Sequence, residues 1–342
     1  MRTFQPILMP NKYKYFFSKE YLIDVKNGKY ENDNDFIIDL FNFQYTNNPI
    51  YNKFCNLVAR TPQNISNIND IPFLPVQFFK TQDIKTLQWN EEAIFTSSAT
   101  TGQTPSKHFC YNIDYYHFVC ESIFEEFYGN VASYQYIALL PSYLERSGSS
   151  LIEMVSHFIK KSPFPESSFY LNEYDKINQI INSSENQLVI FGVSFALLDF
   201  IEKNDSFNND NLIIIETGGM KGRREEIVRE ELHKVLKKGF NIGQISSEYG
   251  MTELMSQAYS KQNGVFHENN FLKIIIKDIN DPFQVMNNNR IGIVNIIDFA
   301  NIYTCCFVAT EDIGKKLDNS TFEILGRHDN SEVRGCNLMF NL

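Results

Sequence analysis

Apolar runs alternate with amphipathic stretches through the middle of the chain, between residues 114 and 247. The apolar runs are short and bounded by turn residues, which predicts strands over residues 136–140, 188–191, 212–215 and 242–247. The stretches between them have helical spacing, which predicts helices over residues 114–129, 151–161, 195–202 and 225–238. Strands that alternate with helices are typical of an α/β fold with a mostly parallel sheet, whose ligands bind beyond the carboxyl ends of the strands.

Two of these helices carry recognisable end signals. Asp114 is the expected N-cap of the first helix, and Gly129 is expected to end it. In the last helix acidic residues come first and lysines come last, and Gly239 is expected to stop it.

The pattern changes after residue 265, where short strands follow one another without helices between them. These strands are expected over residues 272–277, 292–297, 303–308 and 321–325, which suits a small β-barrel-like subdomain. We therefore expect four parts. They are a helical and extended region packed on the core (1–90), an α/β nucleotide-binding core (90–264), a small β subdomain (265–326) and a hinge-like tail (327–342).

Composition narrows the classes of partner. The formal net charge of −10 argues against nucleic acid, because phosphate backbones are bound by dense lysine and arginine. No apolar run reaches the length of a membrane span, and the N-terminus lacks the apolar segment of a signal peptide. Six cysteines without a regular framework suggest reduced thiols, and the histidines lack zinc-site spacing. These features predict a cytoplasmic enzyme.

A loop rich in hydroxyl groups follows residue 96, where a strand is expected to end. Small residues let backbone N–H groups turn toward an anion, hydroxyls add donors, and a lysine adds a fixed cation. The loop therefore suits a phosphate group, although it does not match the Walker pattern, and the alternative is an ordinary surface loop. The candidate phosphate ligands are Ser97, Ser98, Thr100, Thr101, Gly102 and Lys107.

Two further segments that follow predicted strands suit the same ligand. Gly218, Gly219 and Met220 offer a flat surface for a ring after the strand over residues 212–215. The next strand leads to a turn with an aromatic ring for a base, a hydroxyl for phosphate and a carboxylate for Mg²⁺, before a helix expected from about residue 254. The residues of this turn are Tyr249, Gly250, Thr252 and Glu253. Each feature alone also fits a common turn or a helix cap.

In their order and separation, these segments resemble the adenylate-forming superfamily, and more closely the LuxE-type acyl-protein synthetases. The resemblance covers residues 90–342. It is carried by residues 97–107, 141–150, 216–224, 247–259, 310–314, 325–329 and 334–339. It implies the fold of the large domain of these enzymes, with mostly parallel sheets flanked by helices and a small β-barrel-like subdomain.

The resemblance also implies roles for individual residues and the cofactors ATP and Mg²⁺. It makes residues 97–107 the phosphate loop, and Gly218 and Gly219 with Tyr249 the adenine site. Thr252 and Glu253 would hold phosphate and Mg²⁺, Asp312 the ribose hydroxyls, and Arg327 ribose or phosphate. Lys221, Arg223 and Arg224 would join Arg327 in a local cluster of cations for ATP.

The sequence departs from the wider superfamily in two places. Ala99 stands where glycine is usual, and Lys107 comes two residues later than in the common loop. The chain ends at Leu342, so the small C-terminal domain of most members, with its lysine, is expected to be missing. In LuxE-type enzymes a cysteine near the C-terminus accepts the acyl group, and Cys336 matches it; the alternative is an inert packing cysteine.

The resemblance therefore implies activation of a carboxylic acid, a fatty acid, to an acyl-adenylate, and transfer to Cys336 for delivery to a partner such as a reductase or a transferase. Alternatives are direct transfer to another acceptor and a non-catalytic nucleotide-binding module. A different enzyme class is suggested by residues 192–196, which imitate a nucleophile elbow and would make Ser194 the nucleophile of an α/β-hydrolase, with His267 or His328 as its base.

Overall fold

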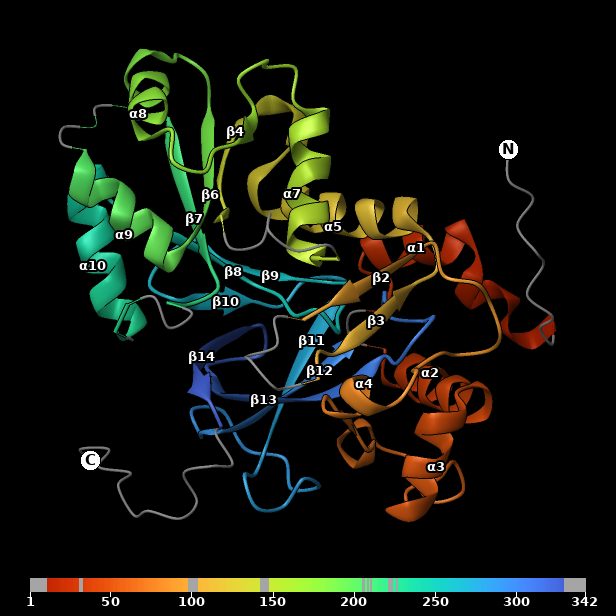
Figure 1. Ribbon diagram of the computed structural model, residues 1–342. Coiled ribbons are helices and arrows are strands. Elements are labelled where there is room, and N and C mark those ends of the chain that lie inside the picture. Colours follow the sequence, from red (N-terminus) through yellow and green to blue (C-terminus); the bar gives the residue numbers. More distant parts are fainter. Residues whose placement is uncertain are drawn as a thin grey trace.

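One large sheet runs through the molecule and carries helices on both faces of its parallel part (Figure 1). The computed structural model describes residues 11–30, 33–97, 104–141, 148–204, 207, 209, 211–220, 224–225 and 227–328. The parallel part has the strand order β8-β7-β6-β4-β5. Its strands are β4 (Gln135–Leu139), β5 (Ser168–Phe169), β6 (Leu188–Val193), β7 (Leu212–Thr217) and β8 (Ser246–Tyr249). The predicted α/β class and parallel sheet are confirmed.

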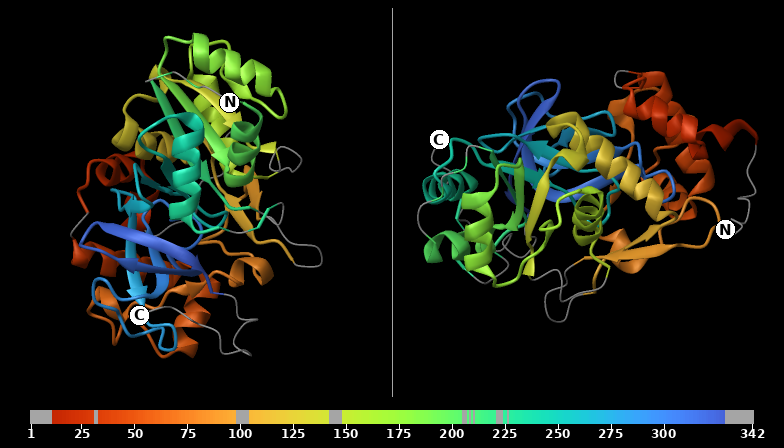
Figure 2. Two further views of the ribbon diagram at one scale, coloured as in Figure 1. Left: turned by 90° about the vertical axis from the view of Figure 1, so that its left-hand side faces the viewer. Right: turned by 90° about the horizontal axis from the view of Figure 1, so that it is seen from above.

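Helices cover both faces of this parallel part (Figure 2). One face carries α5 (Ile113–Tyr128) and α7 (Ser150–Lys161). The other carries α8 (Tyr174–Ser183), α9 (Ser194–Lys203) and α10 (Arg229–Phe240). Their amphipathic spacing explains this arrangement, because each helix turns an apolar stripe toward β-branched residues on the sheet.

The sheet continues without a break in hydrogen bonding into antiparallel strands, in the order β8-β9-β10-β14-β13-β12-β11. These strands are β9 (Ala258–Ser260), β10 (Val265–His267), β11 (Leu272–Lys277), β12 (Gly292–Asp298), β13 (Phe307–Lys316) and β14 (Thr321–Arg327). The strands expected for a β subdomain thus pair with the core through β10 and β9, and the domain boundaries stay a prediction.

The N-terminal region packs against the antiparallel strands. It contains η1 (Asn11–Phe17), α1 (Lys19–Lys26), α2 (Asn34–Asn47), α3 (Pro49–Leu57), η2 (Ile68–Asp70), β1 (Leu74–Pro75) and α4 (Phe78–Thr81). The rings of Phe41 and Tyr51 contact Phe307 at centroid distances of 6.3 and 5.9 Å, and β1 pairs in parallel with β13. A hairpin of β2 (Ala93–Thr96) and β3 (Lys107–Cys110) and the short η3 (Val131–Ser133) complete the described elements.

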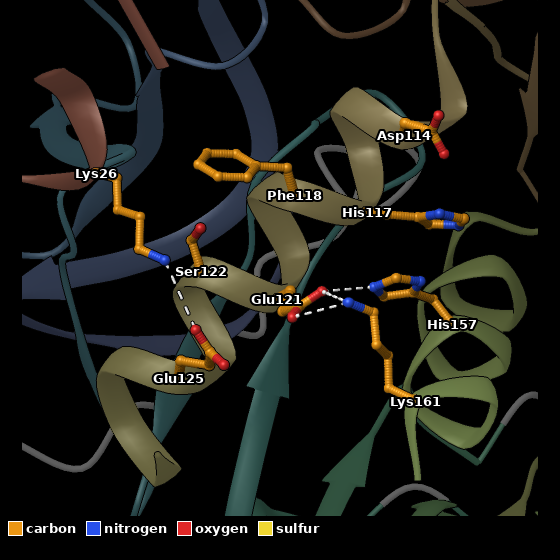
Figure 3. Close-up of a pocket in the computed structure, with 9 residues that line it drawn as sticks. All are labelled: Lys26, Asp114, His117, Phe118, Glu121, Ser122, Glu125, His157 and Lys161. Atoms are coloured by element: carbon orange, nitrogen blue, oxygen red, sulfur yellow. Dashed lines mark hydrogen bonds and ion pairs between the residues drawn. The ribbon is translucent and has the colours of Figure 1, made fainter. Parts of the chain in front are cut away.

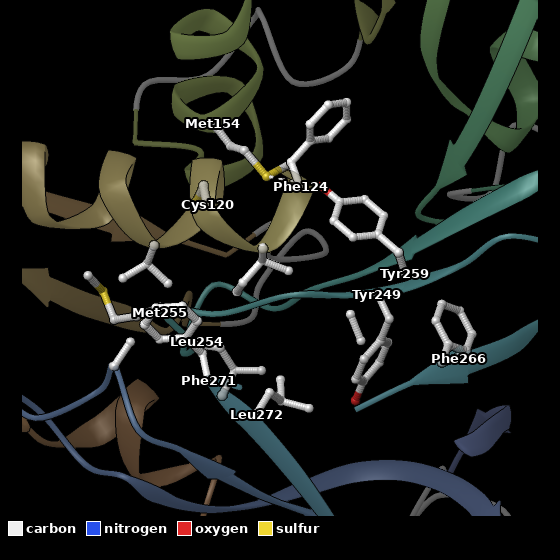
Figure 4. Packing of buried hydrophobic residues seen from close by; sticks show 14 of the residues in the cluster. Cys120, Phe124, Met154, Tyr249, Leu254, Met255, Tyr259, Phe266, Phe271 and Leu272 are labelled. Carbon is white, nitrogen blue, oxygen red and sulfur yellow. Dashed lines mark hydrogen bonds between the residues drawn. The ribbon is translucent and has the colours of Figure 1, made fainter. Parts of the chain in front are cut away.

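A single apolar core joins the two parts of the sheet (Figure 4). Phe124 of α5 packs between Phe158 of α7 and Tyr259 of β9, with centroid distances of 4.9 and 6.1 Å. Leu272 of β11 belongs to the same cluster. The five cysteines in the described ranges are buried and free. No helix there is both long and apolar enough to cross a bilayer.

The helix expected from residue 254 is wrong, because residues 251–257 form turns that lead into β9. The buried carboxylate of Asp298 accepts hydrogen bonds from the backbone N–H groups of Met255 and Ser256, at 2.8 and 3.1 Å. These donors are therefore satisfied by a residue distant in sequence rather than by a helix.

Other helix and strand ends differ from the predicted ones for local reasons. The N-cap of α5 is Asn112, whose side chain accepts from the N–H of Tyr115, and not Asp114. Gly239 lies inside α10, which ends at Phe240 before Asn241 in the left-handed conformation. The strand expected over residues 303–308 begins only at Phe307, because two turns precede it: the N–H of Asn301 donates to the carbonyl of Asp298 at 3.0 Å, and the N–H of Thr304 donates to the carbonyl of Asn301 at 3.2 Å.

Candidate functional site

The β2–β3 hairpin carries the first predicted segment. Thr96 pairs with Lys107 across the hairpin, so Ser97 and Lys107 stand at the two ends of the predicted phosphate loop. Ser97 closes the loop by a backbone bond to Ser106 at 3.1 Å and accepts the N–H of Ser106 on its hydroxyl at 2.8 Å. The N–H of Thr96 donates to the carbonyl of Gly148 at 2.7 Å, which places the hairpin beside the segment that follows β4. Lys107 is exposed.

Some predicted residues lie outside the described residues, and their predictions stand as made. They are Ser98, Thr100, Thr101 and Gly102 of the loop, Lys221 and Arg223 of the cation cluster, and Cys336.

The structure brings together Tyr249, Asp312 and Arg327, which come from three strands. The Tyr249 hydroxyl donates to Oδ2 of Asp312 at 2.7 Å, and Asp312 pairs with Arg327 between β13 and β14. Burial raises the pKa of Asp312, while the Tyr249 hydrogen bond and the charge of Arg327 act against that shift. The Arg327 guanidinium also donates to Glu311 at 3.1 Å. The residues expected at adenine and at ribose are thus in direct contact.

Glu253 lies nearby and is 6% exposed. Burial raises the pKa of Glu253, and the Ser106 hydroxyl and the charges of Arg327 and Lys80 lower it in turn. These neighbours come from the predicted loop, from β14 and from α4, so residues from three separate parts of the chain lie near the carboxyl group of Glu253. It forms no ion pair within 4 Å with any side chain in the described ranges.

A buried histidine holds the turn that contains Thr252 and Glu253. Nε2 of His108 contacts Asn301 and Thr304, both at 2.9 Å, and Asn301 donates to the carbonyl oxygen of Glu253 at 2.9 Å. Burial lowers the pKa of His108 to about 4, and hydrogen bonds to Asn301 and to the backbone of Thr252 oppose that shift. His108 is therefore neutral at pH 7 and anchors this turn to the loop before β13.

Glu216, near the end of β7, is buried beside Arg229 and His233. Its Oε1 lies 3.3 Å from Nε of Arg229 and 3.5 Å from Nε2 of His233. Burial alone would raise the pKa of Glu216, but the hydrogen bond from His233 and the charge of Arg229 bring it below its usual value. Arg229 also donates to the carbonyl of Ile324 on β14 at 3.1 Å. Arg229 thus joins the strand end before Gly218 to the strand that carries Arg327.

The two glycine turns follow adjacent strands. Glu216 pairs with Ser247, so Gly218 and Tyr249 each lie two residues beyond a matched pair at the same edge of the sheet. Gly218 adopts a φ of +72°, which favours glycine. A Cβ on Gly250 would lie 2.3 Å from Oε1 of Glu248, so that glycine leaves room for the carboxyl group. Met220 is buried and Gly219 is half-buried.

Glu248 is a further acidic group at this edge. It accepts a hydrogen bond from the Thr217 hydroxyl. Burial and the nearby charge of Glu216 raise the pKa of Glu248 to about 7, against the effect of that hydrogen bond. Glu248 therefore titrates near neutral pH, and no cation in the described residues pairs with it.

The hydrolase interpretation of Ser194 is not supported. A nucleophile at a strand-to-helix elbow must be exposed, but Ser194 is 2% exposed. Its hydroxyl is bound between Oε2 of Glu216 and the carbonyl of Gly218, both at 3.3 Å. Ser194 begins α9 without capping it, and it steadies the turn at Gly218.

Arg224, expected in the cation cluster for ATP, instead binds Asp199 and Glu202 of α9.

Sequence reasoning missed several residues that shape this region. Arg229, His108 and Lys80 lie next to predicted site residues, but they carried no motif. For Lys80 the sequence offered one signal: this lysine directly follows two phenylalanines, shortly after Pro75, in a region where the sequence otherwise showed no chemistry.

A separate pocket of about 410 Å³ lies between α1, α5 and α7 (Figure 3). The rings of His117 and His157 stack there at 4.0 Å, and His157 and Lys161 both contact Glu121. Burial lowers the pKa of His157, although the hydrogen bond to Glu121 opposes this. No predicted site residue lines the pocket, and most of its charged groups pair with one another. The candidate site is therefore at the strand ends.

The chain is similar to known proteins in sequence and in fold. A family model described as "Acyl-protein synthetase, LuxE" matches residues 15–109 and 151–342. The "Long-chain-fatty-acid--luciferin-component ligase" of Vibrio harveyi is 23% identical over 335 residues, which cover 87% of this chain and 84% of that protein.

Two solved structures share the fold. One is 2-hydroxyisobutyryl-CoA ligase in complex with 2-HIB-AMP and CoA, with a TM-score of 0.65 and 11% identity, covering 87% of this chain and 68% of that one. The other is ATP-bound MatB from Rhodopseudomonas palustris, with a TM-score of 0.53 and 14% identity. The match covers 71% of this chain and spans only 50% of MatB. At these identities the structures show the fold alone.

Proposed function

The chain belongs to the LuxE family of acyl-protein synthetases, and from this premise we propose that it is a ligase that activates a fatty acid with ATP. The acid's carboxylate attacks the α-phosphate and forms an acyl-adenylate. The acyl group then passes to Cys336 as a thioester and from there to a protein partner, a reductase or a transferase. The relatives described above support the first step: one is named a fatty-acid ligase, and another was solved with an acyl-adenylate.

The observation that carries the proposal is the contact between Tyr249 and Asp312, beside Arg327 and Glu253. Residues assigned separately to adenine, ribose and phosphate lie together at one edge of the sheet, although they are spread over about 80 residues of sequence. Asp312 accepts hydrogen bonds from two ribose hydroxyls, and the guanidinium of Arg327 offers a forked cation for phosphate.

The residues present also fit Mg²⁺. The Glu253 carboxyl group is buried beside the Ser106 hydroxyl, and burial raises its pKa against the opposing effects of that hydroxyl and of the charges of Arg327 and Lys80. Mg²⁺ prefers oxygen ligands and takes one or two carboxylates together with phosphates and water. Glu253 would hold the ion, and Thr252 would hold phosphate. When bound, the ion neutralises phosphate charge. The described residues form no cluster of three or more His, Cys, Asp or Glu side chains that could hold a metal ion.

Chemically, adenylation is a displacement at the α-phosphorus. A carboxylate oxygen forms a bond to phosphorus, the bond to the bridging oxygen breaks, and its electron pair leaves with pyrophosphate. The Cys336 thiolate then attacks the acyl carbon, and AMP leaves with the electrons of the C–O bond. The protein's part is to position the carboxylate and to stabilise charge with the donors of residues 97–107 and Arg327.

Exchange of labelled pyrophosphate into ATP, measured with a panel of carboxylic acids, tests the first step. We expect exchange only when a fatty acid is present, and much less in Asp312→Ala. If no acid supports exchange while ATP still binds, the chain is a nucleotide-binding module and the proposal fails.

Mass spectrometry of the intact protein after incubation with ATP and the acid tests the second step. We expect an acyl adduct on the wild type, removable by hydroxylamine as a thioester is, and none on Cys336→Ser. Cys336→Ser should still exchange pyrophosphate, which serves as the control for folding. An adduct on both proteins, or on neither while pyrophosphate is released, would remove Cys336 from its role and favour direct transfer to another acceptor.

A further inference from the structure

The N-terminal region contains a lysine, Lys80, that lies close to the candidate site. β1 pairs with Val308 and Ala309 of β13, and the N–H of Val76 donates to the carbonyl of Ala309 at 2.9 Å. Gln77 then donates to Oε1 of Glu311 at 2.6 Å, and the same carboxylate accepts from Arg327 through Oε2. One carboxylate therefore separates the start of α4 from Arg327, and Lys80 follows within the same short helix.

The other side of α4 is fixed to the hairpin that carries the predicted phosphate loop. Phe79 is buried, and its ring meets the ring of His108 edge to face at 5.9 Å. His108 is the second residue of β3, directly after Lys107, and it anchors the turn of Thr252 and Glu253. α4 thus contacts β3 and directly follows β1, which pairs with β13 (Figure 1), and Lys80 lies three residues after Gln77, on the same side of this short helix.

Lys80 is half-buried, and its ammonium group forms no ion pair within 4 Å with a carboxylate in the part of the chain that the structure describes. Lys80 is nevertheless close enough to Glu253 that its charge lowers the pKa of that carboxyl group. A half-buried cation with no acidic partner, beside a carboxyl group suited to Mg²⁺, is the arrangement expected where a polyphosphate brings the missing negative charge.

We propose that Lys80 is a further phosphate-binding residue, whose ammonium group holds the two outer phosphates of ATP beside Glu253. This rests on the proposed function and deepens it. During adenylation the bond between the α-phosphorus and the bridging oxygen breaks, and the electron pair leaves with that oxygen. Lys80 stays protonated and neutralises charge on the departing pyrophosphate. The residue belongs to a region in which the sequence alone showed no chemistry.

Calorimetric titration with Mg²⁺·ATP and, separately, with AMP tests the assignment without any reaction. The variants are Lys80→Ala and Lys80→Gln, with Lys53→Ala on the exposed side of α3 as the matched control. Removing a charge-assisted contact should weaken ATP binding about tenfold or more, while AMP, which lacks the outer phosphates, should bind within about twofold of wild type. Lys53→Ala should leave both ligands unchanged.

Equal weakening of ATP and AMP, or no weakening of either, would overturn the assignment. If Lys80→Ala does not fold, Lys80→Gln decides by the same ratio, because it keeps most of the side chain's length and its polarity and removes its charge. If the wild type binds ATP but exchanges no pyrophosphate with any acid, the proposed function fails. The ratio of the ATP and AMP affinities still tests the role of Lys80 in that case. A wild type that binds no ATP would overturn both.

Discussion

Carboxyl groups at the candidate site have different charge states because their neighbours differ. Glu216 is ionised, since His233 and Arg229 outweigh its burial. Glu248 directly follows Ser247, which pairs with Glu216; it has Glu216 and no cation beside it, and its pKa is raised to about 7. Burial also raises the pKa values of Glu253 and Asp312. Uncompensated acids of this kind are common where a cationic or hydrogen-bonding ligand binds.

Glu248→Gln should change how stability depends on pH. Because the pKa of Glu248 is higher in the folded than in the unfolded chain, the folded state binds more protons between pH 4.5 and about 7. Its contribution to the free energy of unfolding is therefore lost as pH rises through that window. We expect Glu248→Gln to be more stable than wild type at pH 8 by about 1–2 kcal/mol, after allowance for partial exposure, and similar at pH 4.5.

Urea unfolding of both proteins at pH 4.5, 6 and 8 gives this comparison. Glu323→Gln, on β14, where the half-buried carboxylate pairs with Lys315, is a control that should not remove the pH dependence expected from Glu248. A constant difference between Glu248→Gln and wild type at all three pH values would contradict the assignment.

Asp312→Asn should weaken the binding of ATP and AMP equally, by about tenfold, because both ligands carry the ribose and a charged acceptor is lost. Tyr249→Phe removes the donor that Asp312 accepts at 2.7 Å and should weaken both ligands by a smaller factor. Calorimetric titration of each variant with the two nucleotides measures this. Preferential loss of ATP would instead place Asp312 at the outer phosphates and remove it from ribose.

At the scale of elements, α9 packs closely against α10 and against β6 and β7. Gly239 makes that contact possible, because a Cβ there would lie 2.5 Å from Cδ1 and 2.8 Å from Cβ of Ile201. Gly239 is therefore an interior residue of α10 that a neighbouring helix requires, although its place after the lysines made it look like a helix stop.

Gly239→Ala should destabilise the protein by about 1–2 kcal/mol, since crowding of 1–3 kcal/mol exceeds the gain of up to 1 kcal/mol in helix propensity. The same substitution in an Ile201→Ala background should destabilise less, because two of the three crowding atoms are gone. A double-mutant cycle by urea unfolding measures the coupling. Strict additivity of the two substitutions would show that the helices do not meet at this point.

At the scale of the whole molecule, the N-terminal helices are tied to the loop before β13 by buried hydrogen bonds. The Tyr21 hydroxyl donates to the carbonyl of Phe299 at 2.6 Å, and the amides of Gln44 and Asn48 donate to the carbonyls of Ile302 and Thr304 at 3.0 and 2.7 Å. This loop also holds His108 and the carbonyl of Glu253. The N-terminal region therefore supports the site through contacts between residues 256 to 278 positions apart.

Asn48→Ala should lower the free energy of unfolding by about 2–4 kcal/mol. The fully buried side chain caps α3 through its oxygen and binds the Thr304 carbonyl through its nitrogen, so both partners lose a hydrogen bond. Asn47→Ala is the control, because the Asn47 side chain donates to the carbonyl of Phe43 in its own helix, and it should change stability by less than about 1 kcal/mol. Equal effects in urea unfolding would show that the long-range contact contributes nothing.

Local pattern was enough for much of the fold and for the order of the site segments. The strands β6, β7, β11 and β12 were predicted within two residues of their ends, because a run of β-branched residues between turn residues has few other conformations. Gly218, Tyr249, Thr252 and Glu253 were proposed from short, continuous segments and Asp312 from the resemblance to the family, and their roles stay predictions. Where local and distant partners competed, as at Met255 and Ser256, the sequence pattern predicted a helix and Asp298 decided otherwise.

By itself, therefore, the sequence determined the α/β class, the parallel strands and the residue types offered to a nucleotide, because these follow from periodicity and from spacing within a few residues. Only the tertiary structure decided which side chains meet. Arg229 reaches both Glu216 and β14, Arg224 is bound to α9, and Lys80 is carried beside Glu253 by strand pairing with β13. The reason is physical: these partners lie far apart in the chain, and burial and sheet pairing bring them together in ways that no local pattern specifies.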